Sequence, residues 1–291
     1  MHPSSSTLYV VATPIGNLED ISARAIRILG EVDLIAAEDT RVSRVLLDKY
    51  SIKTPMFSCH KFNEEKRGDF FISKLLEGKN IALISDAGTP CISDPGHRLV
   101  GLAHKNGVTV TSVGGPSSVM SALSVSGFDA ACFTFIGFLP KGGAGKKILD
   151  DCIKRGGTYV FFESPKRINK TLSAISEISH DICVCLCNDL TKKFERVYHG
   201  NIADVLGDVL VNENCEKGEY TCVISSPPQE ALENEPISIE AQIVDIMVKR
   251  NISMKDAAGE LKTQNPKLQK KLIFNAMLSL KGLFPNIYKR G

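Results

Sequence analysis

Short apolar runs alternate with amphipathic segments through the first part of this chain, and this alternation limits the folds open to it. Between the runs, apolar residues such as Val42, Val45 and Leu46 recur at the spacing of a helix. Strands separated by helices of this length form a parallel sheet with helices on both faces. We therefore expect a mostly parallel α/β domain over residues 1–138. The runs predict strands at residues 8–12, 33–37, 55–58, 81–84 and 108–113.

Polar residues gather where these strands end. The carboxyl ends of parallel strands share one edge of a sheet, which is where open α/β folds bind ligands. Carboxylates would repel a polyphosphate, and together with hydroxyls they suit a ligand with sugar hydroxyls or a positive charge. One such loop could be a plain surface turn, whereas several on one edge favour a ligand site. The polar segments are Thr13–Asn17, Glu38–Arg41, Ser85–Gly96 and Gly114–Ser118.

The remaining chain predicts a second α/β domain over residues 139–230 and a helical tail over residues 231–291. Glycines and lysines at residues 140–147 indicate a mobile connection. Residues 227–236 are rich in proline, glutamate and asparagine and indicate a linker. The tail contains an amphipathic helix at residues 239–250, a short helix capped by Ser253 and a final helix started by Asn265–Pro266. Its lysines fit either a helix-turn-helix unit or a docking tail.

Composition excludes several classes of protein. The net charge is only +2, so any nucleic-acid-binding surface must be local. The nine cysteines form no C-x-x-C pair and no metal-ligand spacing, so we expect no metal and a reducing compartment. No apolar run is long enough for a signal peptide or a membrane span. We therefore expect a cytoplasmic protein.

Five motifs occur in order along the chain: Thr13–Leu18, Ala37–Arg41, Ser85–Pro90 with Ser93–Gly96, Gly137–Pro140 and Glu163–Pro165. Together they resemble the tetrapyrrole methylase family, in its branch that methylates ribosomal RNA. The resemblance runs from Leu8 to Ile224, and the helical tail resembles an extension of the same proteins. One departure lies at Asn188–Asp189, where relatives have Arg-Glu before Leu-Thr-Lys.

This resemblance implies an S-adenosyl-L-methionine-dependent enzyme that methylates the ribose 2′-hydroxyl of a cytidine in the decoding region of 16S rRNA. It implies a fold of two α/β domains with the cofactor between them, and a homodimer acting on the small ribosomal subunit. Methyl transfer from a sulfonium is a single in-line displacement, so the protein mainly aligns the reacting atoms. A ribose hydroxyl is weakly acidic and benefits from a general base.

Candidate site residues fall into three groups. The candidate general bases, unranked, are the strand-end carboxylates Asp39, Asp86 and Glu163. The candidate cofactor-binding residues are Thr13, Pro14, Gly16, Ser85, Asp86, Ala87, Gly88, Thr89, Pro116 and Ser117. The candidate RNA-binding residues are Arg41, Lys141, Lys146, Lys147, Lys166 and Arg167.

Two other functions are compatible with the same motifs. The first is a methyltransferase of this fold that acts on a small tetrapyrrole or corrinoid macrocycle. The basic tail and the lysines of residues 140–147 speak against it, because a small substrate needs neither. The second is a non-catalytic RNA- or nucleotide-binding module. The clustering of polar groups along one sheet edge speaks against that alternative.

Overall fold

The computed structural model describes residues 6–61, 63–227, 238–266 and 268–283. The chain divides into two compact units, residues 1–229 and 230–291, and each is described by itself. Apart from Pro227, the predicted linker at residues 227–236 lies outside the described residues, as does the predicted domain boundary at residue 230. Among the described residues, no helix combines the length and apolar character that crossing a membrane requires.

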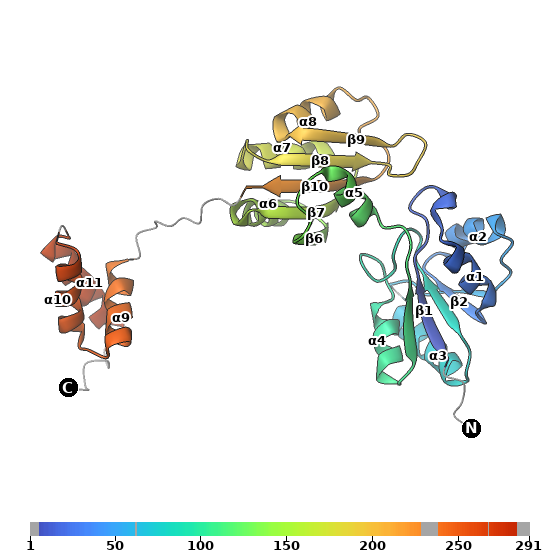
Figure 1. Ribbon diagram of the computed structural model, residues 1–291, viewed down its shortest axis with the longest axis horizontal. Helices are drawn as coiled ribbons and strands as arrows, with labels where there is room; N and C mark the ends of the chain where they lie inside the picture. Colours follow the sequence, from blue (N-terminus) through green and yellow to red (C-terminus); the bar gives the residue numbers. More distant parts are fainter. Residues whose placement is uncertain (1–5, 62, 228–237, 267, 284–291) are drawn as a thin grey trace. The chain divides into compact units, whose positions relative to one another are not determined.

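The first sheet of the larger unit is fully parallel. Its strand order is β3-β2-β4-β1-β5, which confirms the mostly parallel N-terminal sheet (Figure 1). β4 and β1 occupy the centre, so their carboxyl-terminal loops lie side by side. The strands are β1 (Thr7–Val11), β2 (Leu34–Ala37), β3 (Met56–Ser58), β4 (Ile81–Ile84) and β5 (Thr109–Val113).

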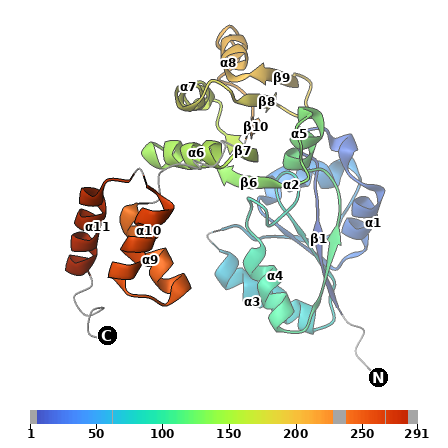
Figure 2. The same cartoon turned by 60° about the vertical axis from the view of Figure 1, so that its left-hand side comes forward.

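Helices cover both faces of this sheet, because side chains along each strand alternate between two cores. In β2, Ile35 and Ala37 join the core under α1 (Ala23–Glu31) and α2 (Thr40–Lys49), preceded by the short helix η1 (Leu18–Asp20). Ala36 joins the core under α3 (Glu64–Leu76) and α4 (His97–Lys105). Figure 2 shows α1 on one side of β1, and α3 and α4 on the other.

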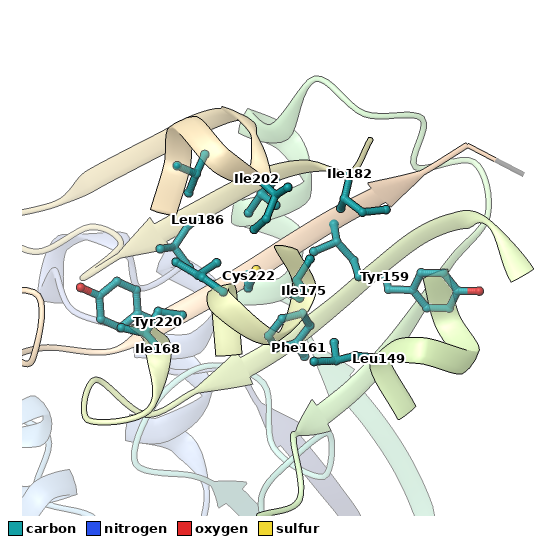
Figure 3. Close-up of a cluster of buried hydrophobic side chains, with 14 of the residues drawn as sticks. Leu149, Tyr159, Phe161, Ile168, Ile175, Ile182, Leu186, Ile202, Tyr220 and Cys222 are labelled. Carbon is teal, nitrogen blue, oxygen red and sulfur yellow. The ribbon is translucent and has the colours of Figure 1, made fainter. Parts of the chain in front are cut away.

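The second sheet is mixed, with strand order β6-β7-β10-β8-β9. β6 pairs parallel with β7, and the other pairings are antiparallel. Figure 3 shows its larger core, formed with α6 (Gly143–Arg155), α7 (Ile168–Ile178) and α8 (Ile202–Leu210). α8 was not predicted from the sequence. The strands are β6 (Phe133–Phe138), β7 (Gly157–Glu163), β8 (Cys183–Asn188), β9 (Arg196–Asn201) and β10 (Tyr220–Ser226).

Helix α5 (Ser118–Ser126) joins the two sheets of this unit. It follows β5 of the first sheet, yet Val119 and Leu123 pack with Val160 and Val223 on the second sheet. β6, which the predicted division places in the first domain, is likewise a strand of the second sheet. The division at residue 138 itself stays a prediction.

The prediction of a mobile connection at residues 140–147 was wrong for most of that segment. α6 begins at Gly143, so Lys146 and Lys147 belong to a helix. Gly145 is buried against the backbone of Pro140, where no side chain would fit. Glycine here permits a close approach of two backbone segments rather than flexibility.

The smaller unit is a helical unit formed by α9 (Ile239–Arg250), α10 (Met254–Gln264) and α11 (Lys270–Leu283). Its core includes Ile243, Leu261 and Ile273. The final helix begins at Lys270, so the prediction that Pro266 starts it was wrong. Asn265 instead ends α10, donating its backbone N–H to the carbonyl of Leu261 at 2.9 Å.

Candidate functional site

A cavity of about 420 Å³ lies between the two sheets of the larger unit, and we call it the first cavity. Its walls come from the loops after β1, β4 and β5 on one side and from β6, β7 and β10 on the other. It is lined by Ile15, Ala87, Gly88, Thr89, Ile92, Ser93, Asp94, Ser117, Ser118, Val119, Phe138, Phe162, Glu163, Ser164, Pro165, Leu190, Glu219, Tyr220 and Thr221.

The loop after β4 is fixed to the loop after β1. Thr13 and Gly88 exchange backbone hydrogen bonds, with N–H to carbonyl distances of 2.9 and 3.0 Å. The Thr13 hydroxyl also donates to the carbonyl of Ser85 at 3.1 Å. Gly88 has φ of +77°, a backbone conformation that favours glycine. These bonds hold the backbone of the β4 loop rigid at the wall of the first cavity.

The first cavity combines an apolar mouth with hydroxyls and carboxylates. Ile92 and Phe138 are 59% and 64% exposed, which leaves a large apolar surface at the opening. The ring of Phe138 packs edge-on against Phe162 at 5.3 Å. Partial burial raises the pKa of Asp94, opposed by a hydrogen bond from Ser85. The site therefore offers both a flat apolar contact and acceptors for a cation.

A second cavity, of about 520 Å³, lies at the same edge of the first sheet. It shares no lining residue with the first cavity. Ser43, on α2, lines it; its hydroxyl is buried and has no hydrogen-bond partner among the described residues. The second cavity is lined by Thr13, Pro14, Leu18, Asp39, Arg41, Val42, Ser43, Val45, Leu46, Ser85 and Asp86.

Asp39 and Asp86 lie together in the second cavity but differ in their environments. Asp39 caps α2, and Arg41 donates to its carboxylate through the backbone N–H, Nε and Nη2 at 2.8, 3.1 and 2.6 Å. These bonds lower the pKa of Asp39 to about 2. Partial burial instead raises the pKa of Asp86, opposed by a hydrogen bond from the backbone N–H of Asp39 at 3.0 Å.

Glu163 is a buried carboxylate with both oxygens occupied. Oε1 accepts from the backbone N–H of Ser164, and Oε2 from the hydroxyl of Thr171, each at 2.7 Å. Arg167 Nη2 lies 3.2 Å from Oε2 and also donates to the carbonyls of Leu139 and Pro140 at 3.0 and 3.1 Å. This network ties the β6–α6 connection to the start of α7, which is a structural role.

Comparison with known proteins identifies the family to which the chain belongs. The model for Tetrapyrrole (Corrin/Porphyrin) Methylases matches residues 7–206, which include every strand of the first sheet, β6 to β9 of the second sheet and all the lining residues of the second cavity. The chain belongs to the tetrapyrrole methylase family. Within this family it is similar to proteins named "Ribosomal RNA small subunit methyltransferase I".

Three of these relatives show how far the similarity extends. The Thermotoga maritima protein is 44% identical over 75% of this chain and 97% of its own length. The Pseudomonas aeruginosa protein is 39% identical over 96% of this chain and 99% of its own length. The Bacillus subtilis protein is 43% identical over 78% of each chain.

Solved structures support the fold of the family. A cobalt precorrin-4 methyltransferase of cobalamin biosynthesis superimposes with a TM-score of 0.58 at 18% identity, covering 76% of this chain and 94% of its own. A uroporphyrin-III-C-methyltransferase from Thermus thermophilus gives a TM-score of 0.52 at 17% identity, covering 76% of this chain and 94% of its own. At these identities the likeness shows the shared fold alone, which confirms the predicted tetrapyrrole-methylase architecture.

The residues predicted to bind the family's cofactor are divided between the two cavities, and two of them line neither. Pro116 lines neither cavity, and its carbonyl accepts a hydrogen bond from the Thr89 hydroxyl at 3.3 Å. Gly16 contacts the loop at residues 190–192 and lines neither cavity. The first cavity is lined by Ala87, Gly88, Thr89 and Ser117, and the second by Thr13, Pro14, Ser85 and Asp86.

The predicted RNA-binding residues differ in whether their charge is already paired within the described part of the chain. Arg41 lines the second cavity with its side chain 89% exposed. Lys146 forms an ion pair with Glu177 at 2.7 Å, and Arg167 is held by Glu163. Three lysines are exposed and form no ion pair within the described part of the chain: Lys141, Lys147 and Lys166.

Five acidic or aromatic residues that line the first cavity were not among the predicted site residues: Asp94, Phe138, Phe162, Glu219 and Tyr220. Asp94 belongs to the segment Ser85–Gly96 that was singled out, so its acidity was a usable signal. Phe138 belongs to the motif Gly137–Pro140, but nothing in that motif marks its ring as a cavity residue. Phe162, Tyr220 and Glu219 lie on β7, on β10 and directly before β10, and no local sequence pattern marks them. Across the described residues, no group of three or more His, Cys, Asp or Glu is placed to hold a metal ion.

The Asn188–Asp189 departure lies in a tightly bonded turn. Asn188 is buried, and its Nδ2 donates to the carbonyl of Lys217 at 3.3 Å. Lys192 Nζ lies 3.0 Å from Asp189 Oδ1 and 2.9 Å from Glu219 Oε2. Asp189 therefore orients, through Lys192, a carboxylate of the first cavity.

Proposed function

We propose that this protein transfers a methyl group from S-adenosyl-L-methionine to the 2′-hydroxyl of a cytidine in 16S ribosomal RNA. The observation that carries the proposal is the identity of 38–44% to proteins named for small-subunit ribosomal RNA methylation, over 75–96% of this chain. The two adjoining cavities support it, because a transferase needs room for a donor and an acceptor.

The first cavity is the proposed cofactor site, and the chemistry of its lining fits the group. The side chains of Ile92 and Phe138 suit the flat face of an adenine ring, and the hydroxyls of Thr89 and Ser117 suit a ribose. The carboxylate of Asp94 suits a positive charge. When bound, S-adenosyl-L-methionine supplies a methyl group on a cationic sulfur that is already activated for transfer.

Asp86 is the proposed proton acceptor among the three candidate bases. Glu163 has both oxygens bonded inside the protein, and the carboxylate of Asp39 is held by Arg41. Asp86 Oδ1 accepts from the backbone N–H of Asp39, while Oδ2 has no partner within the described residues. The raised pKa of Asp86 also makes its carboxylate a stronger base than an ordinary aspartate.

RNA would reach the site through exposed cations. Arg41 stands at the second cavity, and Lys141, Lys147 and Lys166 are exposed in the second α/β part. The basic helical unit gives a further surface for the small ribosomal subunit, and removing residues 239–291 is expected to weaken RNA binding more than cofactor binding. A homodimer and a cytoplasmic location remain parts of this proposal.

The proposal is tested by methyl transfer in vitro. We expect labelled methyl groups from S-adenosyl-L-methionine to enter 16S RNA or immature small subunits, with the label mapped to a cytidine 2′-oxygen. Transfer to a porphyrinoid acceptor but to no RNA would support the small-macrocycle alternative. Cofactor binding without transfer to any acceptor would support a non-catalytic module.

A further inference from the structure

The connection between β8 and β9, residues 189–195, forms part of the wall of the first cavity, and we call it the β8–β9 turn (Figure 1). Leu190, within the turn, lines that cavity. Lys192 Nζ lies 2.9 Å from the carboxylate of Glu219, which also lines it. Side chains that the turn exposes to solvent therefore stand beside the proposed donor site.

The backbone of the β8–β9 turn is held in an unusual conformation. Asp189 and Thr191 have φ of +53° and +65°, a region that β-branched residues such as threonine rarely adopt. The Thr191 N–H donates to the Glu195 carboxylate, and the Thr191 hydroxyl oxygen accepts from the N–H of Asn17 at 3.0 Å. Such conformations persist only where surrounding contacts impose them, and they cluster at functional sites.

This fixed turn displays an aromatic ring. Phe194 is 72% exposed, and the ammonium of Lys193 lies 5.5 Å from the centroid of its ring. The backbone on both sides is bonded, because the Glu195 N–H donates to the carbonyl of Lys192 at 3.1 Å and the Lys192 N–H to that of Asp189 at 2.9 Å. The turn therefore presents a flat apolar group and a cation side by side.

The charges around Phe194 indicate what kind of partner fits. The carboxylates of Asp189, Glu195 and Glu219 each accept a hydrogen bond from within the same region. Lys193 and Arg196 are exposed and form no ion pair within the described part of the chain. The charge left for a partner is positive, which favours a polyanion. A second copy of this chain would bring the same cations to a two-fold contact here, which is unfavourable.

The exposed ring distinguishes between forms of RNA. A base inside a duplex is stacked on both faces and offers none to a protein side chain, whereas an unpaired base can stack on an aromatic ring. A lysine beside the ring suits the phosphate of the same strand. Proteins that bind single strands combine these two kinds of contact.

We propose that the β8–β9 turn binds an unpaired nucleotide of the substrate RNA, whose base stacks on Phe194 and whose phosphate lies at Lys193. The inference rests on the proposed function and names a contact that holds the RNA strand beside the first cavity. Neither residue takes part in methyl transfer itself, so the contact affects RNA affinity and not donor affinity.

The test measures the Kd of the full chain for 16S RNA. Phe194→Ala should raise this Kd about tenfold, with unchanged S-adenosyl-L-methionine affinity by titration calorimetry and unchanged Tm. Phe194→Leu should bind as weakly as the alanine variant, because leucine has no flat face, and Phe194→Trp should retain the wild-type affinity. The control is Val211→Ala after α8, a residue 81% exposed that lines neither cavity, for which Kd should be unchanged.

Salt dependence tests the lysine separately. Lys193→Ala should lower the slope of log Kd against log salt concentration by about 0.7, the share of one phosphate of a single strand. Phe194→Ala should leave this slope unchanged, because stacking releases no counterion.

Several outcomes would overturn the contact. Wild-type RNA affinity in Phe194→Ala excludes it, and full affinity in Phe194→Leu excludes stacking. Loss of a dimer in Phe194→Ala with unchanged RNA affinity would make the turn a subunit interface instead. Absence of methyl transfer to RNA by the wild-type protein would overturn the proposed function, whereas the stacking contact is judged by RNA affinity alone. The two failures are therefore distinguishable.

Discussion

The backbone N–H of Asp39 donates to Asp86 Oδ1 at 3.0 Å, which joins the end of β2 to the end of β4. This bond occupies Oδ1 of the Asp86 carboxylate, and Asp86 lines the second cavity. The two carboxylates are neighbours, yet one is held by Arg41 and the other is not. Because of this difference, Asp39 is assigned as the cap of α2 and Asp86 as the candidate base.

Asp86→Asn should lower the rate of methyl transfer by about a hundredfold or more, the usual share of a general base. The amide keeps the shape and still accepts from Asp39, so cofactor affinity should be unchanged. Single-turnover transfer of labelled methyl measures the rate. Because burial raises the pKa of Asp86, the wild-type rate should rise with pH through a value above the ordinary aspartate range. Wild-type rates in this variant would exclude Asp86 as the base.

Arg41→Ala should return the pKa of Asp39 from about 2 toward its ordinary value, because the guanidinium bonds that lower it are lost. A carboxylate with a lowered folded-state pKa stabilises the fold above its unfolded pKa, and this contribution disappears as the pH falls through the folded value. The stability difference between wild type and variant should therefore shrink between about pH 4 and pH 2. Denaturant unfolding across this range measures it.

Arg44→Ala is the matched control for that experiment. Arg44 lies on the same helix, is exposed and lines neither cavity. Its removal should leave the titration of Asp39 unchanged. An equal effect from both arginines would mean that general charge, rather than the bonds from Arg41, sets the pKa of Asp39.

Arg167→Ala should destabilise the protein by about 3 kcal/mol, because it removes one partner of a buried ion pair. We expect the lower end of the usual range for such a loss, because the arginine side chain is 29% exposed. The side chain of Glu163 is only 1% exposed and would lose its guanidinium partner. Lys166→Ala, at the exposed neighbouring position, should change stability by less than about 0.5 kcal/mol and weaken RNA binding. Thermal unfolding and RNA titration of both variants test this division of roles. Equal stability of the two variants would contradict it.

Local patterns predicted the fold well where burial repeats along the chain. The run Ile81–Ile84 is apolar throughout because β4 is central and covered on both faces, and this was visible in the sequence. The role of Gly145 was not visible, because a glycine that admits a neighbouring backbone and one that provides flexibility look alike in sequence. The sequence likewise did not reveal that α5 packs on the second sheet, because that sheet is formed by strands far along the chain.

The sequence predicted at which edge of the first sheet the candidate site lies, but not which residues line each cavity. Polar strand ends identified which loops meet, since parallel strands place them together. The sequence did not reveal that Asp86 and Ala87 line different cavities, because that depends on the pairing of Thr13 with Gly88. The sequence also did not reveal that Arg167 forms an ion pair with Glu163. An arginine that binds phosphate and one that pairs with a buried carboxylate cannot be told apart in a sequence.

Gly16→Ala should destabilise the larger unit by about 1–3 kcal/mol through overpacking. A Cβ at this position would lie 2.9 Å from Thr191 Oγ1 and 3.0 Å from the carbonyl of Leu190. The loop would have to move, breaking the bond from the Asn17 N–H to Thr191 Oγ1 at 3.0 Å and shifting Leu190 in the first cavity. Cofactor affinity should therefore fall together with Tm.

Gly30→Ala is the matched control, and we expect it to raise the stability of the protein rather than lower it. Gly30 lies in α1 with open space around the position of a Cβ, so alanine should stabilise the helix by about 0.5–1 kcal/mol. Thermal unfolding and cofactor titration of both variants form one comparison. If Gly16→Ala kept the wild-type Tm and cofactor affinity, the contact between the β1 loop and the loop at residues 190–192 would not support the first cavity. A loss of Tm and cofactor affinity in Gly16→Ala alone would show that the contact of Gly16 with the loop at residues 190–192 maintains the structure of the first cavity.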